Sequence, residues 1–283
     1  MGVLRNVHKI NKDKEMWGHY RRVTKMGNKG LLKRSIEIIK TEGIGTFAKK
    51  STFYVYRKTV LPILVPVISY KLKKEVENIK DVEDVVRFTF TFKYLGFNIK
   101  PLQIFEEILE LAKLVSGLEP KVVLEIGTAN GGTLFFWSRL ASDDATLISI
   151  DLPGGLFGGG YPLWKVPLYR SFAKPHQKMY LLRANSHDPT TLEKVKELLR
   201  GKQVDFLFID GDHTYKGVKR DFEMYAPLVR KGGIIAFHDI VLHPPETGCE
   251  VNKFWNEIKH NFRHEEIVKD WDQKWAGIGV LYI

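Results

Sequence analysis

The chain has 283 residues, of which 44% are hydrophobic and 12% aromatic, enough apolar material for the core of one large domain, with or without an appendage. Its one cysteine, Cys249, excludes an intramolecular disulfide framework and fits a reducing compartment. The first residues lack the charged, apolar and small-residue order of a signal peptide, so we expect a cytoplasmic protein, free or attached to a membrane surface.

The net charge of +11 is concentrated at the N-terminus. Residues 1–60 hold 15 Lys and Arg against 4 Asp and Glu, whereas the remaining 223 residues hold 29 of each sign. A segment this basic is typical of one that faces something anionic. We therefore expect a basic, helical N-terminal appendage over 1–80 and a catalytic domain over 81–283.

Two segments of the appendage carry apolar patterns. Residues 31–40 place their apolar side chains on one face of a helix, and residues 59–70 form a mostly apolar run interrupted by Pro62 and Pro66. Twelve residues are too few to cross a bilayer, which needs about 20. The pattern favours peripheral membrane contact through residues 1–70, and the alternative is a solvated helix plus a strap packed on the domain. Nucleic acid is disfavoured because no recognised binding module accompanies the charge.

From residue 100 onward, short apolar runs alternate with helical patterns. Buried parallel strands are apolar on both faces and need helices between them, so the chain predicts an α/β fold with a Rossmann-like, mostly parallel seven-stranded sheet. The last two runs have no helix between them, which predicts a terminal antiparallel hairpin at the sheet edge. The expected strands are 121–126, 146–150, 178–182, 204–209, 233–237, 264–269 and 277–283, and the expected helices are 102–117, 131–140, 189–200, 216–229 and 250–261.

A glycine-rich turn follows the first expected strand, in VVLEIGTANGGTLFFW (122–137). Glycines let the backbone pass close to a ligand, but the spacing is not the G-x-G-x-x-G that suits a dinucleotide. S-adenosylmethionine has no phosphate, and Glu125 is placed to meet its ammonium group directly or through water. The alternative is a tight strand-to-helix turn that binds nothing. The cofactor residues predicted in this turn and just before it are Glu125, Gly127, Thr128, Gly131 and Gly132.

Two further strand ends offer polar side chains to the same ligand. Asp151 follows the second strand, where an acid can accept both ribose hydroxyls of S-adenosylmethionine or of NAD. Ser186 and Asn185 follow the third strand and are predicted to contact an adenine ring. Either of these two residues could instead cap the helix over 189–200.

Acidic and imidazole side chains follow the next two strands, in IDGDHTY (209–215) and FHDI (237–240). The carboxyl ends of parallel strands share one edge of the sheet, so these side chains are expected to converge there. Oxygen ligands with one imidazole suit a divalent metal, and a histidine suits a base toward a metal-acidified hydroxyl. The alternative is that the acids cap the next helix and the second histidine is a structural hydrogen-bonding group. The side chains are Asp210, Asp212, His213, His238 and Asp239.

Four segments of the chain together resemble class I S-adenosylmethionine-dependent methyltransferases of the methyltransferase 24 type. The segments are LEIGTANGGTLFFW, LISIDLPGG, FLFIDGDHTYKGVKRDFEMYAPLVRKGGIIAFHDI and WAGIGVLYI. Relatives in that family include macrolide-sugar O-methyltransferases and cephalosporin hydroxylase-like proteins, and the resemblance covers about residues 100–283. Its Asp-x-x-His motif implies that Asp210 binds metal beside the cofactor and that His213 is the catalytic base. The family's pair of acids falls on His238 and Asp239, and a histidine in first place weakens the preference for Mg²⁺ and makes Mn²⁺, Fe²⁺ or Zn²⁺ credible.

Two loops are expected to face the acceptor. A glycine-rich segment over 153–178 carries aromatic side chains and predicts a lid over a sugar or an aromatic ring, the alternative being a compact structural loop. Residues 241–255 are expected to form the opposite wall. The four aromatic residues of the lid are Phe157, Tyr161, Trp164 and Tyr169.

The sequence thus predicts metal-assisted O-methylation of a sugar, glycan or small-molecule hydroxyl, with S-adenosylmethionine and a divalent metal (Mg, Mn or another) as cofactors. Two alternatives stay open. One is an NAD-dependent oxidoreductase, against which the missing dinucleotide motif and the terminal hairpin argue. The other is a non-catalytic, membrane-docked adaptor with a vestigial cofactor site, which would need neither a base nor metal ligands. Neither the acceptor nor the oligomeric state follows from the sequence.

Overall fold

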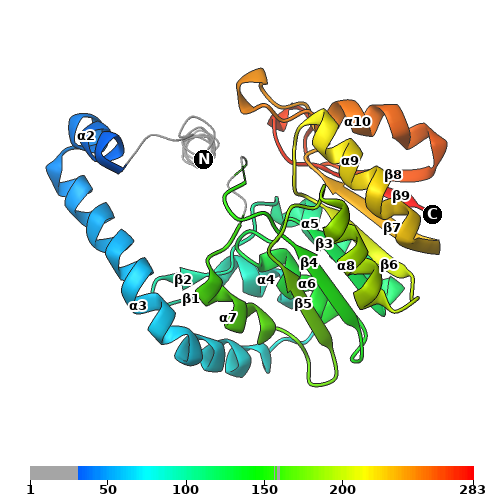
Figure 1. Ribbon diagram of the computed structural model, residues 1–283, viewed down its shortest axis with the longest axis horizontal. Coiled ribbons are helices and arrows are strands. Elements are labelled where there is room, and N and C mark those ends of the chain that lie inside the picture. The colour runs from blue at the N-terminus through cyan, green and yellow to red at the C-terminus, as the bar shows by residue number, and fades with distance from the viewer. Residues whose placement is uncertain (1–30, 156, 158–159) are drawn as a thin grey trace, which may run out of the picture.

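The computed structural model describes residues 31–155, 157 and 160–283, so the first 30 residues of the predicted membrane-facing segment lie outside the described part. Figure 1 shows a central sheet with helices on both faces and a long helical arm before it. The α-helices are α2 (Leu31–Glu42), α3 (Ile44–Val76), α4 (Val82–Thr91), α5 (Phe105–Leu118), α6 (Gly132–Leu140), α7 (Val166–Arg170), α8 (Pro189–Leu199), α9 (Tyr215–Tyr225) and α10 (Val251–Ile258). The strands are β1 (Lys93–Tyr94), β2 (Phe97–Asn98), β3 (Val122–Ile126), β4 (Thr146–Ile150), β5 (Lys178–Leu182), β6 (Val204–Ile209), β7 (Val229–His238), β8 (Arg263–Ile267) and β9 (Ile278–Tyr282).

The sheet has seven strands in the order β5-β4-β3-β6-β7-β9-β8. The first five run parallel, and β9 pairs antiparallel with both β7 and β8. This confirms the predicted Rossmann-like fold and its terminal antiparallel hairpin. The short β1 and β2 form a separate two-stranded hairpin, which the sequence pattern did not predict.

Successive residues of the central strands pack into two different cores. In β3, Val123 packs with the helices α3 to α7, whereas Val122 and Leu124 pack with α8 to α10. The same alternation holds in β6, where Phe206 and Leu207 face opposite sides of the sheet. Strands covered on both faces are mostly apolar, with few buried polar exceptions such as Glu125, which is why these runs were recognisable in the sequence.

The last strand of the chain does not lie at the sheet edge. β9 (IGVLY) is buried at four of its five positions and inserts between β7 and β8. β8 (RHEEI) alternates exposed and half-buried residues and takes the edge. An edge strand exposes unpaired backbone groups, so the charged strand there protects the sheet from pairing with other chains.

A buried carboxylate, Glu107 on α5, anchors the link between these two strands. It accepts the backbone N–H of Lys269 at 3.0 Å and that of Gly277 at 2.9 Å, and the side-chain amide of Gln273 at 2.7 Å. Buried backbone amides need such partners, so Glu107 stabilises an otherwise irregular segment.

The apolar run over 59–70 is part of one continuous helix of 33 residues, although Pro62 and Pro66 lie inside it. One side of α3 packs into the core of the domain, so the packed-strap interpretation is correct for that face. A left-handed Gly43, with φ of 85°, separates α3 from α2. None of the helices in the described ranges combines the length and the apolar character needed to span a bilayer.

Candidate active site

The glycine turn after β3 is required by close contacts within the protein. A Cβ on Gly127 would lie 2.1 Å from the carbonyl oxygen of Asp210, and one on Gly131 would lie 2.7 Å from the ring of Tyr169. A Cβ on Gly132 would lie 2.3 Å from a backbone oxygen. Gly127 and Gly131 also have positive φ, at 100° and 82°. Packing of the turn on its neighbours therefore explains all three glycines, and their role toward a cofactor stays a prediction.

Glu125, in β3 just before this turn, is fully buried within the core. Its carboxylate accepts the indole N–H of Trp137 at 3.0 Å and the hydroxyl of Ser149 at 2.7 Å, and Ser149 is hydrogen-bonded in turn to Thr128. Burial raises the pKa of Glu125 to about 8, although hydrogen bonds from Thr133, Ser149 and Trp137 oppose the rise. Near neutral pH this carboxyl is therefore mostly protonated. Its predicted contact with the ammonium of S-adenosylmethionine is untested.

Asp151, at the tip of β4, connects the glycine turn to the following loop. One carboxylate oxygen accepts the backbone N–H of Ala129 and the other that of Gly160, both at 2.8 Å. The side chain is almost fully buried, and burial raises its pKa despite these hydrogen bonds. The structure thus places Asp151 beside Gly127 and Thr128 at the carboxyl edge, where the sequence predicted it.

The polar residues after β5 are not the helix caps that the sequence allowed as an alternative. The cap of α8 is Asp188, which accepts the backbone N–H of Thr190. Ser186 is buried and its carbonyl accepts the hydroxyl of Tyr225 at 2.8 Å, while the side chain of Asn185 accepts the backbone N–H of His187 at 3.0 Å. Their contact with adenine stays a prediction.

The ends of β6 and β7 bring the predicted acids and imidazoles together. Nδ1 of His238 lies 3.2 Å from Oδ1 of Asp210 and 3.3 Å from Oδ1 of Asp239, and Nδ1 of His213 lies 2.7 Å from Oδ2 of Asp239. Asp212 is turned away, because its side chain accepts the backbone N–H of Thr214. Thr214 is the cap of α9, so Asp210 is not a capping residue.

Asp239 is the centre of the cluster. It has a positive φ of 67°, which is uncommon for a residue other than glycine but tolerated by Asp. Burial would raise the pKa of Asp239, but the neighbouring His238 and His243 hold it well below its usual range. The carboxylates of Asp239 and Asp210 outweigh burial and raise the pKa values of His213 and His238 well above that of free histidine, and a hydrogen bond that His213 donates to the sulfur of Cys249 adds to the rise for His213. In this arrangement protonated imidazoles neutralise the carboxylates.

Three further residues of the cluster were not predicted. Nε2 of His243 lies 3.1 Å from Oδ1 of Asp239, and the buried thiol of Cys249 hydrogen-bonds to the rings of both His213 and His243. The side-chain amide of Gln103 donates to Oδ2 of Asp210 at 2.7 Å. The one available signal was that the chain's single cysteine falls in the loop after FHDI.

The ligand chemistry of this cluster fits a divalent cation. Asp210, His238 and Asp239 each offer one ligand atom, and these atoms lie within 4.8 Å of one another. His213, Asp239 and Cys249 form a second such group that shares Asp239. Nε2 of His238 is buried without a hydrogen-bond partner among the described residues, which is costly unless something else binds it. Imidazole and thiolate ligands favour Zn²⁺, Fe²⁺ or Mn²⁺ over Mg²⁺.

The predicted aromatic lid is wrong for two of its members. Tyr161 and Tyr169 are buried in the core, and Tyr169 donates to the carbonyl of Ala129 at 2.9 Å, so it supports the glycine turn from below. Phe157 does lie over the site, where its ring stacks on His213 with centroids 4.8 Å apart and planes at 19°. Periodicity cannot distinguish an aromatic residue that covers a site from one that anchors a loop to the core.

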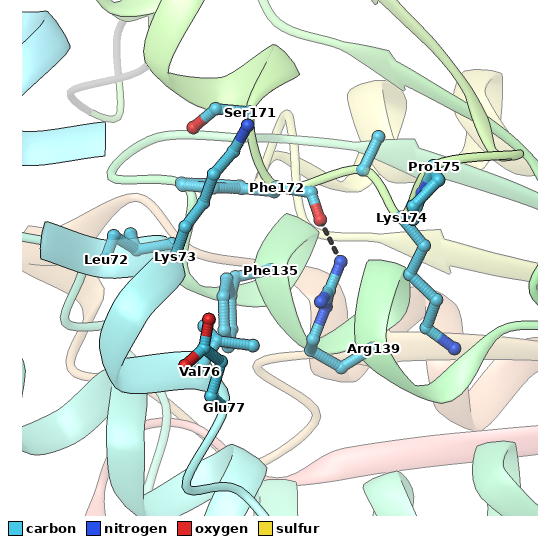
Figure 2. A pocket seen from close by; sticks show the side chains of 11 residues that line it. Leu72, Lys73, Val76, Glu77, Phe135, Arg139, Ser171, Phe172, Lys174 and Pro175 are labelled. Atoms are coloured by element: carbon cyan, nitrogen blue, oxygen red, sulfur yellow. Dashed lines mark hydrogen bonds between the residues drawn. The ribbon is translucent and has the colours of Figure 1, made fainter. Parts of the chain in front are cut away.

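A cavity of about 450 Å³ lies elsewhere, between α3, α6 and the segment 171–175 (Figure 2). Its walls include Phe135, Phe172 and Lys73, and Arg139 closes one side by donating to the carbonyl of Phe172. None of the predicted site residues lines it. Arg139 is in the last turn of α6 and 171–175 precedes β5, so this cavity is not at the carboxyl edge of the sheet.

The fold and this edge define a Rossmann-like domain: a seven-stranded sheet with an antiparallel β9 inserted between β7 and β8, and a glycine turn after β3. Residues 124–240 match the family model described as a methyltransferase domain, of the methyltransferase 24 type. The matched segment begins in β3 and includes the glycine turn, Asp151, and the Asp210, His213, His238 and Asp239 side chains of the cluster, but not Gln103, His243 or Cys249. This confirms the resemblance seen in the sequence.

Two curated relatives match about half of the chain, and both are uncharacterized proteins. One, from Acanthamoeba polyphaga mimivirus, is 34% identical over 138 residues, which is 48% of this chain and 60% of the relative. The other, from Sinorhizobium fredii, is 28% identical over 148 residues, which is 51% of this chain and 16% of the relative. The chain thus spans about three-fifths of the length of the mimivirus relative and about one-sixth of the length of the Sinorhizobium relative.

Solved structures of similar topology include an O-methyltransferase from Bacillus cereus in complex with SAH, at 16% identity and a TM-score of 0.47 over 75% of this chain and 96% of that one. Another is the O-methyltransferase TomG from Streptomyces achromogenes in complex with SAM, at 15% identity and a TM-score of 0.47, covering 73% of this chain and 91% of that one. A third is a putative O-methyltransferase from Klebsiella pneumoniae, at 16% identity and a TM-score of 0.48, covering 77% of this chain and 96% of that one.

Proposed function

We propose that the protein transfers the methyl group of S-adenosylmethionine to a hydroxyl of a sugar, glycan or small molecule, assisted by a divalent metal. The observation that carries the proposal is the convergence of Asp210, His213, His238 and Asp239 beside the glycine turn and Asp151. A domain that only binds its partner needs no such cluster of buried ionisable groups, whose desolvation is costly.

In this proposal His213 is the proton acceptor, and a divalent cation bound by the neighbouring carboxylates would offset the negative charge that otherwise keeps the ring protonated. Asp239 holds Nδ1 of the ring at 2.7 Å, which leaves Nε2, 3.7 Å from Asp210, to face the reacting hydroxyl. As the acceptor oxygen attacks the methyl carbon, its proton passes to Nε2 and the carbon–sulfur bond breaks, which releases S-adenosylhomocysteine. Phe157 covers the ring of His213 and limits the access of water.

Asp210, His238 and Asp239 would hold the metal. A bound divalent cation would position the acceptor oxygen and lower the pKa of its hydroxyl. Gln103 orients Asp210 through a hydrogen bond at 2.7 Å, and the backbone N–H of Ala276 orients Asp239 at 3.0 Å. Such supporting contacts fix the direction of the ligand atoms.

Calorimetric titration with S-adenosylhomocysteine, with and without Mn²⁺, tests the proposed donor. We expect binding in the micromolar range, about −8 kcal/mol. His213→Asn should bind the same ligand with unchanged affinity and should lower methyl transfer to a responsive acceptor by roughly 10²- to 10⁴-fold. Failure of the native chain to bind under every metal condition would contradict the assignment and favour the adaptor. Full activity of His213→Asn would remove His213 as the base.

Metal content tests which group of ligands is used. We expect Asp239→Asn to lose a bound divalent metal, measured by mass spectrometry after dialysis, and Cys249→Ser to retain it. Substitution with Co²⁺ gives a second measurement, because a thiolate ligand adds a sulfur-to-cobalt charge-transfer band and the expected spectrum lacks that band. If the band is present and disappears in Cys249→Ser, the metal is bound by His213, Asp239 and Cys249 instead. His213 would then be a ligand and not a base.

A further inference from the structure

One face of α3 is apolar and exposed, although the opposite face is already packed on the domain. The packed face is formed by four side chains that are each at most 6% exposed: Leu61, Val65, Ile68 and Leu72. On the other side, at spacings of three, four and three residues, the chain exposes Val60 at 38%, Ile63 at 76%, Val67 at 46% and Tyr70 at 69%. Helical residues at these spacings share one face. We call these four residues the outer stripe of α3.

Basic residues lie at both ends of the outer stripe. Four of them are exposed, namely Arg57, Lys58, Lys73 and Lys74, and the fifth, Lys71, is half-buried. α3 contains no acidic residue before Glu75, which pairs with Lys71 at 2.9 Å. The combination of an apolar stripe with cationic ends and almost no negative charge is therefore a property of this single helix.

We propose that the outer stripe of α3 docks on an anionic lipid bilayer, with the helix lying in the plane of the membrane surface. Apolar side chains would enter the boundary between head groups and acyl chains, while the basic residues bind lipid phosphates and carboxylates. Tyr70 has the amphipathic ring that is enriched at such boundaries. The basic excess of residues 1–60 adds attraction of the same sign.

A bilayer fits this surface better than a second copy of the chain does. Two copies that met through the outer stripe would bring ten basic side chains together with few acids to offset them, and like charges at an interface oppose association. The arrangement of α3 is also suited to a flat partner: Figure 1 shows the helix running along the outside of the domain, with its first half and α2 extending beyond the sheet. This inference does not depend on the proposed methyl transfer.

Sedimentation of the full chain with vesicles tests the proposal. We expect binding to phosphatidylcholine vesicles that contain about one-third phosphatidylglycerol, little binding to phosphatidylcholine alone, and release when salt is raised from about 0.1 M to about 0.5 M. Ile63→Gln combined with Val67→Gln should weaken binding at least about tenfold, because both side chains are exposed and would enter the membrane.

Matched variants control for general effects. Leu242 is 69% exposed but lies outside α3, so Leu242→Gln should leave vesicle binding unchanged. Lys73→Gln with Lys74→Gln should weaken binding, whereas the exposed pair Lys216→Gln and Lys231→Gln should not. Equal binding by the native chain and the Ile63/Val67 variant would overturn the proposal, as would absence of binding to anionic vesicles. Self-association that the same variant abolishes would assign the stripe to a second copy instead.

Discussion

We expect the free energy of unfolding to fall as the pH rises from about 5 to about 8, and we expect Glu125→Gln to remove the part of that fall that begins near pH 5. His213 and His238, whose pKa values are also raised, add to the fall above about pH 6.5. Burial raises the pKa of Glu125 from 4.5 to about 8, so over this range the folded chain holds a proton that the unfolded chain has released. The stabilising effect is complete below the lower pKa and is lost as the pH passes the upper one. A shift of this size corresponds to roughly 5 kcal/mol as an upper limit.

Urea denaturation of both proteins at several pH values is the measurement. The variant retains an acceptor for Trp137 and a partner for Ser149, so the two proteins should have similar stability near pH 5 and diverge as the pH rises. Parallel pH profiles would mean that Glu125 is ionised in the folded chain. Its charge would then be available to the ammonium of the methyl donor, and the variant should lose at least about tenfold in affinity for S-adenosylhomocysteine.

A second large effect is expected for Gly127→Ala. The new Cβ would lie 2.1 Å from the carbonyl oxygen of Asp210 and 2.6 Å from its carbonyl carbon, and both belong to backbone that cannot rotate away. The backbone N–H of Asp210 also binds the carbonyl of Ile126 at 2.8 Å, so β3 and β6 would have to separate at the site. Overpacking and the φ of 100° together should cost about 3 kcal/mol or more in denaturation experiments.

Gly201→Ala is the matched control for that variant. Gly201 has a similar φ of 81°, but a Cβ there would meet nothing within 4 Å. It should therefore show only the cost of the left-handed conformation, about 1 kcal/mol. If both variants lose the same stability, the contact with Asp210 is not what requires glycine at 127, and a role toward the cofactor becomes the better explanation.

The boundaries of several sheet strands could be predicted closely because each strand is a short, mostly apolar run. The predicted spans 146–150, 178–182 and 204–209 agree with β4, β5 and β6 at both ends, although β5 lies at the sheet edge and is only half-buried. β7 begins four residues earlier than the predicted 233–237, since Val229 pairs with Val204 before a register shift. Gly232 and Gly233 concealed that extension in the sequence.

The candidate site was predictable where it depends on topology. Asp151, Asp210, His213, His238 and Asp239 each lie at or just after the carboxyl end of a strand, and parallel strands place such residues at one edge of the sheet. His243, Cys249 and Gln103 reach the same cluster from loops and carry no periodic signal. Gln103 meets Asp210 across 107 residues of sequence, a contact that only the folded chain can produce.

The sequence alone therefore determined the class of fold, the edge at which the chemistry gathers and the basic character of the N-terminal part, because each is written in a local pattern of residue types. The tertiary structure decided three matters that depend on packing between distant segments. Glu125 is enclosed by Trp137 and Ser149, β9 displaces β8 from the interior of the sheet, and α3 buries one apolar face while it exposes another. The shape and packing of the neighbouring elements decide which apolar surface is buried. They also decide which carboxylate is removed from solvent.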